Sequence, residues 1–267
     1  MSKSIYIINK MKKELEAFDR LLEIMNELRE KCPWDKKQTI ESLRTLTIEE
    51  TYELADAIIK NDLPEIKKEL GDLLLHIVFY AKIGSEINEF DITDVINGIN
   101  NKLVHRHPHV FGNVKVTDSR AVEENWESIK LEEKDRDNSV LSGVPDSLPA
   151  LVKANRVQQK VRGVGFDWEE RSQIWDKVNE ELNELKDEIE INDQEKIEAE
   201  FGDLFFSLIN AARLYDIDPE TALERTNKKF IKRFNFLEDQ TLKKGISLKN
   251  MSLNEMNVIW EKAKQFD

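Results

Sequence analysis

The chain has 267 residues, of which 40% are hydrophobic and 35% charged, and it contains only nine glycines and six prolines. This composition predicts long amphipathic helices with enough apolar side chains for one large or two small domains. The formal net charge of −13 argues against general binding to nucleic acid, which requires a basic face to neutralise phosphates. A small polyanionic substrate is compatible with this charge if metal ions supply the positive charge.

The single cysteine, Cys32, cannot form a disulfide within the chain, which favours a reducing compartment. The apolar run at the N-terminus is too short for a signal peptide, and the apolar stretches 73–81 and 204–214 are too short to span a bilayer. We therefore expect a cytoplasmic protein without a membrane partner.

Apolar residues follow helical spacing along most of the first half. The expected helices cover 11–29, 64–81, 91–106 and 121–134. A further helix, which carries Glu49, Glu50 and Glu53, is expected to end near 61. Pro33 ends the first helix, since proline disfavours helix at the residue before it. The segment 105–112 is expected to be irregular.

Residues 135–149 are rich in Asp, Ser and Gly, contain two prolines, and form the best candidate linker. They would separate an N-terminal domain, 1–134, from a C-terminal domain, 150–267. In the second half we expect a helix over 150–160, a pair of acidic helices, a helix over 219–236 and a last helix ending with Trp260.

Two acidic motifs occur once in each half and superimpose without a gap when every number is shifted by 131. The first half has Glu49-Glu50-x-x-Glu53 and Glu69-x-Gly71-Asp72, and the second has Glu180-Glu181-x-x-Glu184 and Glu200-x-Gly202-Asp203. A period of about 130 residues is too long for a solenoid repeat. Duplication of a whole helical domain describes it better.

These motifs predict paired sites for a hard cation. Residues three apart lie on one face of a helix, and Asn192-Asp193 marks a turn, so two antiparallel helices should bring the acids together. In the second copy the acids are Glu181, Glu184, Glu200 and Asp203; in the first they are Glu50, Glu53, Glu69 and Asp72. Four converging carboxylates repel one another without a cation and suit Mg²⁺ or Mn²⁺.

The alternative for each acidic pair is a solvated helix face, which is common in a chain with 53 acidic residues. Recurrence at identical spacing in both copies argues against it, as do the apolar runs that follow Asp72 and Asp203. A zinc site at His105, His107 and His109 is disfavoured because the second copy has no histidine.

Basic residues at i, i+4 spacing follow each acidic pair. They are Lys229 with Arg233, and Lys102 with Arg106. Lysine offers a point charge and arginine a bidentate fork for phosphate oxygens. A surface basic turn is the alternative.

Taken together, these motifs resemble the two-domain bacterial MazG nucleoside triphosphate pyrophosphohydrolases, and the resemblance covers nearly the whole chain. It rests on Cys32-Pro-Trp-Asp35, the two acidic motifs, His105-Arg-His-Pro-His-Val-Phe111 and Val164-Gly-Phe-Asp-Trp168. It implies two tandem all-α domains, a four-helix-bundle core completed by homodimerisation, and Mg²⁺ as cofactor, with Mn²⁺ as a possible substitute. The implied reaction converts (d)NTPs to (d)NMPs and pyrophosphate, for nucleotide-pool control or house-cleaning.

The resemblance also implies roles for individual residues, with the C-terminal copy as the catalytic one. Metal ligands would be Glu181, Glu184, Glu200 and Asp203; nucleotide contacts would be Lys177, Glu180, Lys196, Lys229, Arg233 and Trp260; the catalytic acids would be Glu180, Glu181 and Glu200. The first copy keeps its acids with Lys102 and Arg106 as a second possible site. However, it has Thr45-Leu46 around the position of Lys177, and Glu65 in place of Lys196.

Two other classes of protein remain as alternatives. A di-iron carboxylate bundle requires Glu-x-x-His, and no histidine follows these glutamates at that spacing. A non-catalytic helical regulator that senses nucleotides would bind them without turnover.

Overall fold

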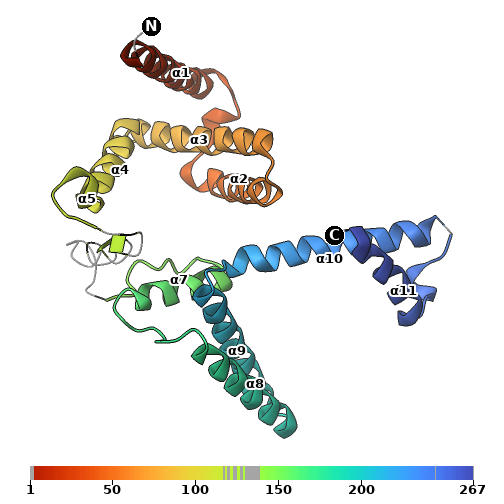
Figure 1. Ribbon diagram of the computed structural model, residues 1–267. Helices are drawn as coiled ribbons and strands as arrows, with labels where there is room; N and C mark the ends of the chain where they lie inside the picture. The colour runs from red at the N-terminus through yellow and green to blue at the C-terminus, as the bar shows by residue number, and fades with distance from the viewer. Residues whose placement is uncertain are drawn as a thin grey trace. The chain divides into compact units, whose positions relative to one another are not determined.

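The computed structural model describes residues 3–116, 118, 121–122, 125–126, 129, 139–243 and 245–266. Within these ranges all regular structure is helical (Figure 1), which confirms the predicted all-α class. The chain forms two compact units, residues 1–115 and 116–267. The first unit contains α1 (Lys3–Lys31), α2 (Ile40–Lys60), α3 (Leu63–Glu86), α4 (Ile92–Arg106) and α5 (Pro108–Phe111). The second contains α7 (Ala150–Arg162), α8 (Gln173–Ile191), α9 (Gln194–Leu214), α10 (Pro219–Leu242) and α11 (Leu253–Ala263).

Each unit contains one antiparallel helix pair, α2–α3 or α8–α9, closed by the same short turn. Asn61 and Asn192 end the first helix of each pair with φ of 55° and 63°, a left-handed conformation that asparagine tolerates better than most residues. The next residues, Asp62 and Asp193, cap the second helix by accepting a hydrogen bond from the backbone amide three residues on. The predicted turn and the predicted pairing are thus confirmed.

Several boundaries differ from those expected. Pro108–Phe111 forms one helical turn where an irregular segment was expected, because proline is tolerated at the start of a helix. Helix α10 continues six residues beyond 236, to Leu242, and α11 continues to Ala263. The helix expected at 121–134 falls mostly outside the described residues.

Part of the expected linker is bonded to the second unit. Residues 139–149 form turns, and the buried ammonium of Lys160 donates hydrogen bonds to the carbonyl oxygens of Val140 and Ser142 at 3.2 and 2.9 Å. The remainder, 135–138, lies outside the described residues, so the domain boundaries stay predictions.

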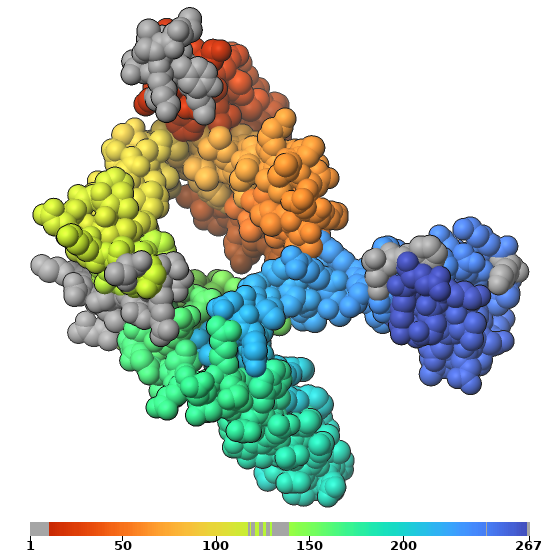
Figure 2. All heavy atoms as spheres, viewed as in Figure 1, coloured from red at the N-terminus to blue at the C-terminus, as the bar shows by residue number. Residues whose placement is uncertain are grey.

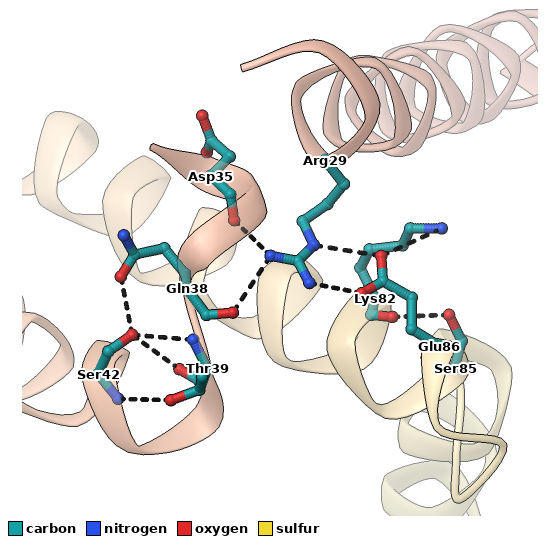
Figure 3. A network of polar contacts seen from close by, with 8 residues as sticks. All are labelled: Arg29, Asp35, Gln38, Thr39, Ser42, Lys82, Ser85 and Glu86. Carbon is teal, nitrogen blue, oxygen red and sulfur yellow. Dashed lines mark hydrogen bonds and ion pairs between the residues drawn. The ribbon is translucent and has the colours of Figure 1, made fainter. Parts of the chain in front are cut away.

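In the first unit, Arg29 ties α1 to α3 and to the segment between α1 and α2 (Figure 3). Its guanidinium makes a bidentate ion pair with Glu86 and donates to the carbonyl oxygens of Asp35 and Gln38. It also lies 5.6 Å from the centre of the Phe79 ring. Since the Arg29 side chain is only 11% exposed, water screens these contacts weakly.

An ion pair of the same kind fixes the loop before α8 in the second unit. The buried guanidinium of Arg213 on α9 makes a bidentate ion pair with Asp167. Gln158 on α7 donates to the carbonyl oxygen of Phe206 at 2.8 Å. The end of the α8–α9 pair around the Asn192 turn extends away from these contacts, and no other element of the second unit covers it on the face seen (Figure 2).

Candidate metal centre

Three carboxylates converge between α8 and α9. Glu181, Glu184 and Glu200 each offer an oxygen, and the three oxygens lie within 4.8 Å of one another. Glu181 and Glu184 are one turn apart on α8, and the antiparallel pairing with α9 adds Glu200 opposite them. Oxygen donors alone suit a hard cation such as Mg²⁺ or Mn²⁺.

The second oxygen of Glu200, Oε2, is buried and has no hydrogen-bond partner. A buried carboxylate oxygen is normally satisfied by a donor or a cation. The donor set and this oxygen therefore fit a divalent cation at the α8–α9 centre.

Lys177 places a positive charge at this centre. Its Nζ lies 2.7 Å from Oε1 of Glu181 and 2.8 Å from Oε1 of Glu180. The hydrogen bond to Glu180, followed by the one to Glu181, raises the pKa of Lys177 above its ordinary value. The ammonium therefore stays charged at neutral pH.

Glu184 shows the electrostatic strain of the cluster. Desolvation raises the pKa of Glu184 most, and the negative charges of Glu181 and Glu200 raise it further. A carboxylate whose ionisation is disfavoured in this way gains from a nearby cation.

The α2–α3 pair carries the matching centre of the first copy. Carboxylate oxygens of Glu50, Glu69 and Asp72 lie within 4.8 Å of one another. Desolvation, followed by the charge of Asp72, raises the pKa of Glu50. The hydrogen bond from Lys68 lowers the pKa of Glu69.

The two centres differ in which three of the four predicted acids meet. Asp203 on α9 is exposed and lies outside the α8–α9 group, whereas its counterpart Asp72 belongs to the α2–α3 group. Conversely, Glu184 belongs to its group, whereas its counterpart Glu53 is exposed and lies outside.

The nucleotide contacts predicted for the second copy are distributed over four helices, α8 to α11. Lys196 lies one turn before Glu200 on α9, and its Nζ is 3.4 Å from Oε1 of Glu188. On α10, Arg233 lies 5.7 Å from the ring centre of Trp260, which also packs against Phe230 at 5.0 Å. Lys229 is exposed on α10, Lys102 is exposed on α4, and Arg106 ends α4 half-buried.

The structure brings Lys177 to the carboxylates but separates the residues of α10 from them. Helix α10 starts beside the C-terminal end of α9 and leads away from the α8–α9 pair (Figure 1). There it packs against α11. Lys229, Arg233 and Trp260 therefore belong to the α10–α11 pair and not to the α8–α9 pair.

A partly buried polar cluster between α2 and α3 was missed from the sequence. Oγ1 of Thr47 lies 2.7 Å from Nδ1 of His76, 2.7 Å from the Tyr80 hydroxyl and 3.0 Å from the Leu43 carbonyl oxygen. With one proton to donate and two lone pairs to accept, this hydroxyl can take part in all three hydrogen bonds. Desolvation lowers the pKa of His76, which favours a neutral ring.

The second copy replaces this cluster by Val178, Ser207 and Ala211, each 131 positions later. That exchange is visible in the sequence. Its meaning depends on knowing that the three side chains meet across two helices.

The fold and the site together define a duplicated all-α protein in which each unit carries an acid-lined antiparallel helix pair. A family profile described as the MazG nucleotide pyrophosphohydrolase domain matches residues 38–111 and 170–236, which include both helix pairs. The chain belongs to the MazG family.

Two relatives of similar length carry corresponding names, and a longer relative is uncharacterised. "Nucleoside triphosphate pyrophosphohydrolase/pyrophosphatase MazG" of Thermotoga maritima is 43% identical over 96% of this chain and 99% of its own. "Nucleoside triphosphate pyrophosphohydrolase" of Escherichia coli K12 is 40% identical over 94% of this chain and 98% of its own. The uncharacterised protein YabN of Bacillus subtilis is 47% identical over 98% of this chain, which spans 55% of that protein.

Proposed function

We propose that this protein is a Mg²⁺-dependent nucleoside triphosphate pyrophosphohydrolase that converts (d)NTPs to (d)NMPs and pyrophosphate. The observation that carries the proposal is the group of three carboxylates, Glu181, Glu184 and Glu200, within 4.8 Å of one another on α8 and α9. Family membership and the names of the full-length relatives support the reaction class.

Glu181, Glu184 and Glu200 would hold the cation, with Asp203 available from the next turn of α9. When bound, Mg²⁺ would neutralise triphosphate charge and acidify a water molecule. Glu180, next to the ligand acids, would accept a proton from the attacking water.

The phosphates require cations of the protein as well. Lys177 is already at the carboxylates, and Lys196 lies one turn from Glu200. Lys229 and Arg233 would neutralise the remaining phosphate charge, with Trp260 beside Arg233 contacting the nucleotide. Because α10 leads away from α8 and α9 within one chain (Figure 1), these residues would need a movement of α10 or a second copy of the chain to reach the same nucleotide.

The C-terminal copy is proposed as the catalytic one because of the residue at position 177. Its counterpart, Leu46, packs against the hydrophobic core formed by Met25, Leu43, Val78, Phe79 and Ile83. That position therefore offers the first copy's carboxylates no ammonium. Glu65 replaces Lys196 and adds a negative charge.

A homodimer is part of the proposal, because both helix pairs expose apolar side chains at equivalent positions. On α3 these are Leu70, Leu74 and Ile77, and on α9 they are Phe201, Phe205 and Leu208, each between 39% and 59% exposed. The spacing i, i+4, i+7 forms one apolar stripe per helix. Exposed stripes of this kind favour association with a second copy, which would complete a four-helix bundle.

The place of action is proposed to be the cytoplasm, with nucleotide-pool control or house-cleaning as the role. No helix in the described part of the chain is both long and apolar enough to cross a membrane. The single cysteine, Cys32, is a free thiol, which agrees with a reducing compartment.

The test is incubation of the purified chain with Mg²⁺ and a panel of canonical and modified NTPs, with pyrophosphate and orthophosphate assayed separately. The proposal expects equal amounts of pyrophosphate and monophosphate. Orthophosphate with diphosphate would contradict the reaction class. Tight nucleotide binding without any product would instead favour a nucleotide-sensing regulator.

A further inference from the structure

Glu188 on α8 is a mostly buried carboxylate to which the proposed reaction gives no role. Its side chain is 18% exposed, and its Oε1 lies 3.4 Å from Nζ of Lys196 in the first turn of α9. Its Oε2 is buried and has no hydrogen-bond partner among the described residues. Burying a charge is costly unless it is paired and fully hydrogen-bonded. Stability alone therefore does not explain a carboxylate at this position.

The first copy shows that the helix pair forms without this carboxylate. Ala57 occupies the position equivalent to Glu188, 131 residues earlier, and packs there with 2% of its surface exposed. Lys196 is replaced by Glu65, which is bonded to Lys68 at 3.0 Å. Both members of the Glu188–Lys196 pair are thus absent from the copy that is not proposed to be catalytic. Their joint presence in the second copy links the pair to the function of that copy.

The pair lies one helical turn from the proposed metal ligands. Glu188 follows Glu184 by four residues on α8, and Lys196 precedes Glu200 by four residues on α9. Because the helices are antiparallel, the Glu188–Lys196 contact lies between the Glu184–Glu200 level and the Asn192 turn. One turn of helix rises about 5.4 Å. A triphosphate whose metal is bound by Glu184 and Glu200 would therefore come within reach of the Lys196 ammonium.

Lys196 needs a partner to hold its ammonium at that level. Its side chain is 59% exposed, and a lysine loses rotamer freedom when its ammonium is fixed. The contact with Glu188 fixes the ammonium before a nucleotide binds, which lowers the cost of binding. Repulsion between Glu188 and the phosphates opposes this effect. Solvent around the exposed lysine screens that repulsion, whereas it does not reduce the cost of ordering the side chain.

We propose that Glu188 is a positioning residue that holds the Lys196 ammonium for the phosphates of the nucleotide and does not itself contact the nucleotide. An ammonium group has three protons to donate, so Lys196 can keep its contact with Glu188 while it donates to a phosphate oxygen. This inference rests on the proposed function, since it requires a nucleoside triphosphate at the α8–α9 centre. It concerns the affinity for the nucleotide and leaves the chemical step unchanged.

The first experiment compares the steady-state kinetics of the wild-type chain and Glu188→Gln, a nearly isosteric change, with Mg²⁺ and one NTP. KM should rise by about 3- to 10-fold, the amount that fixing one flexible side chain contributes, while kcat stays within about twofold. The matched control, Glu190→Gln, removes the same charge from an exposed position of α8 and should change neither constant. An unchanged or lower KM in Glu188→Gln overturns the proposal.

A double-mutant cycle tests whether Glu188 acts through Lys196. A Lys196→Gln background has no ammonium to hold, so adding Glu188→Gln removes only a negative charge near the phosphates. That addition should no longer raise KM, because the two residues act as one unit. A general structural role would raise KM in both backgrounds. A rise of similar size in both backgrounds therefore overturns the proposal.

Binding of an NTP analogue with a methylene bridge between the α- and β-phosphates separates this inference from the proposed reaction. The analogue is not cleaved, so its Kd, measured by calorimetry with Mg²⁺, should increase in Glu188→Gln as KM does. A wild-type chain that binds the analogue but releases no pyrophosphate from NTPs would contradict the reaction alone. Equal Kd values for the wild-type chain and Glu188→Gln overturn the positioning role alone. A wild-type chain that does not bind the analogue overturns both.

Discussion

Nζ of Lys177 lies 2.7 Å from Oε1 of Glu181, a carboxylate that is itself proposed as a metal ligand. Without a metal, this ammonium serves as the counter-ion of the α8–α9 centre. When a metal–nucleotide complex binds, the same ammonium can turn to the phosphates, because its side chain is 37% exposed and lysine is flexible.

Replacement of Lys177 by glutamine should therefore have two opposite effects. Mn²⁺ affinity without nucleotide should rise, since no ammonium competes for Glu181, while kcat/KM should fall because the phosphates lose a neutralising charge. Each change should be roughly tenfold or more, the equivalent of one charged hydrogen bond. Mn²⁺ titration and steady-state kinetics measure the two effects. Lys186→Gln, at an exposed lysine of the same helix, should change neither.

Replacement of Glu200 by glutamine should reduce turnover by at least about 100-fold, because it removes a metal ligand. The helical circular dichroism spectrum should be unchanged, since Glu200 is half-buried and the variant is nearly isosteric. Glu198→Gln, at an exposed position of the same helix, is the control. Near-normal turnover of the Glu200 variant would remove the α8–α9 centre from the mechanism.

Metal binding at the α8–α9 centre should weaken on acidification, starting above pH 4.5. The ordinary pKa of Glu184 is 4.5, and desolvation together with Glu181 and Glu200 raises it. Because only the ionised carboxylate binds metal, Mn²⁺ affinity should fall as pH decreases through the raised pKa. Mn²⁺ titrations across that range should show that the affinity of the Glu184→Gln variant falls at a lower pH than that of the wild-type chain. Identical pH profiles would exclude Glu184 as the titrating group.

The same raised pKa predicts how the stability of the metal-free chain depends on pH. The folded state holds the Glu184 proton more tightly than the unfolded chain does. The contribution of this group to stability should therefore decrease as pH rises through the raised pKa. Mn²⁺ should offset that decrease, which unfolding midpoints measured with and without Mn²⁺ would reveal.

The dimer prediction is tested at Phe205, which is 59% exposed on the apolar stripe of α9. Phe205→Glu would place a charge in the proposed interface, where its desolvation has no compensation. The dimer should weaken by at least about 100-fold, corresponding to roughly 3 kcal/mol, as measured by sedimentation equilibrium. Gln194→Glu adds the same charge at an exposed position outside the stripe and should leave the dimer intact. A monomeric wild-type chain would contradict the prediction.

The Thr47 cluster predicts that removing the Thr47 hydroxyl costs the first unit more stability than removing the hydroxyl of Thr51. Thr47→Val, which introduces the residue of the second copy, leaves Nδ1 of His76 and the Tyr80 hydroxyl without their shared partner. The first unit should lose about 1–3 kcal/mol, measured by hydrogen exchange of α2 and α3. Thr51→Val, at an exposed threonine one turn later on α2, should cost far less. Equal losses would mean that helix propensity, and not the cluster, is responsible.

The helices, the duplication and the acids that share a helix face could all be predicted from the sequence alone. Helical periodicity depends only on residues close together in the chain. The turn at Asn61 or Asn192 requires a left-handed residue followed by a capping aspartate. Both the helices and the turns can therefore be predicted from short stretches of sequence. The spacing Glu-x-x-Glu likewise fixes which acids share a helix face.

The packing of two helices against each other sets which acids meet, how deeply each is buried and which cation lies against them. Glu69 is fully buried while Glu184 is exposed, although both belong to the same repeated motif pair. Lys68 contacts Glu69 and Lys177 contacts Glu181. A shift of 131 residues does not turn one of these contacts into the other. These differences depend on side-chain direction and packing between two helices, whereas the spacing of residues along the chain specifies only the face of one helix.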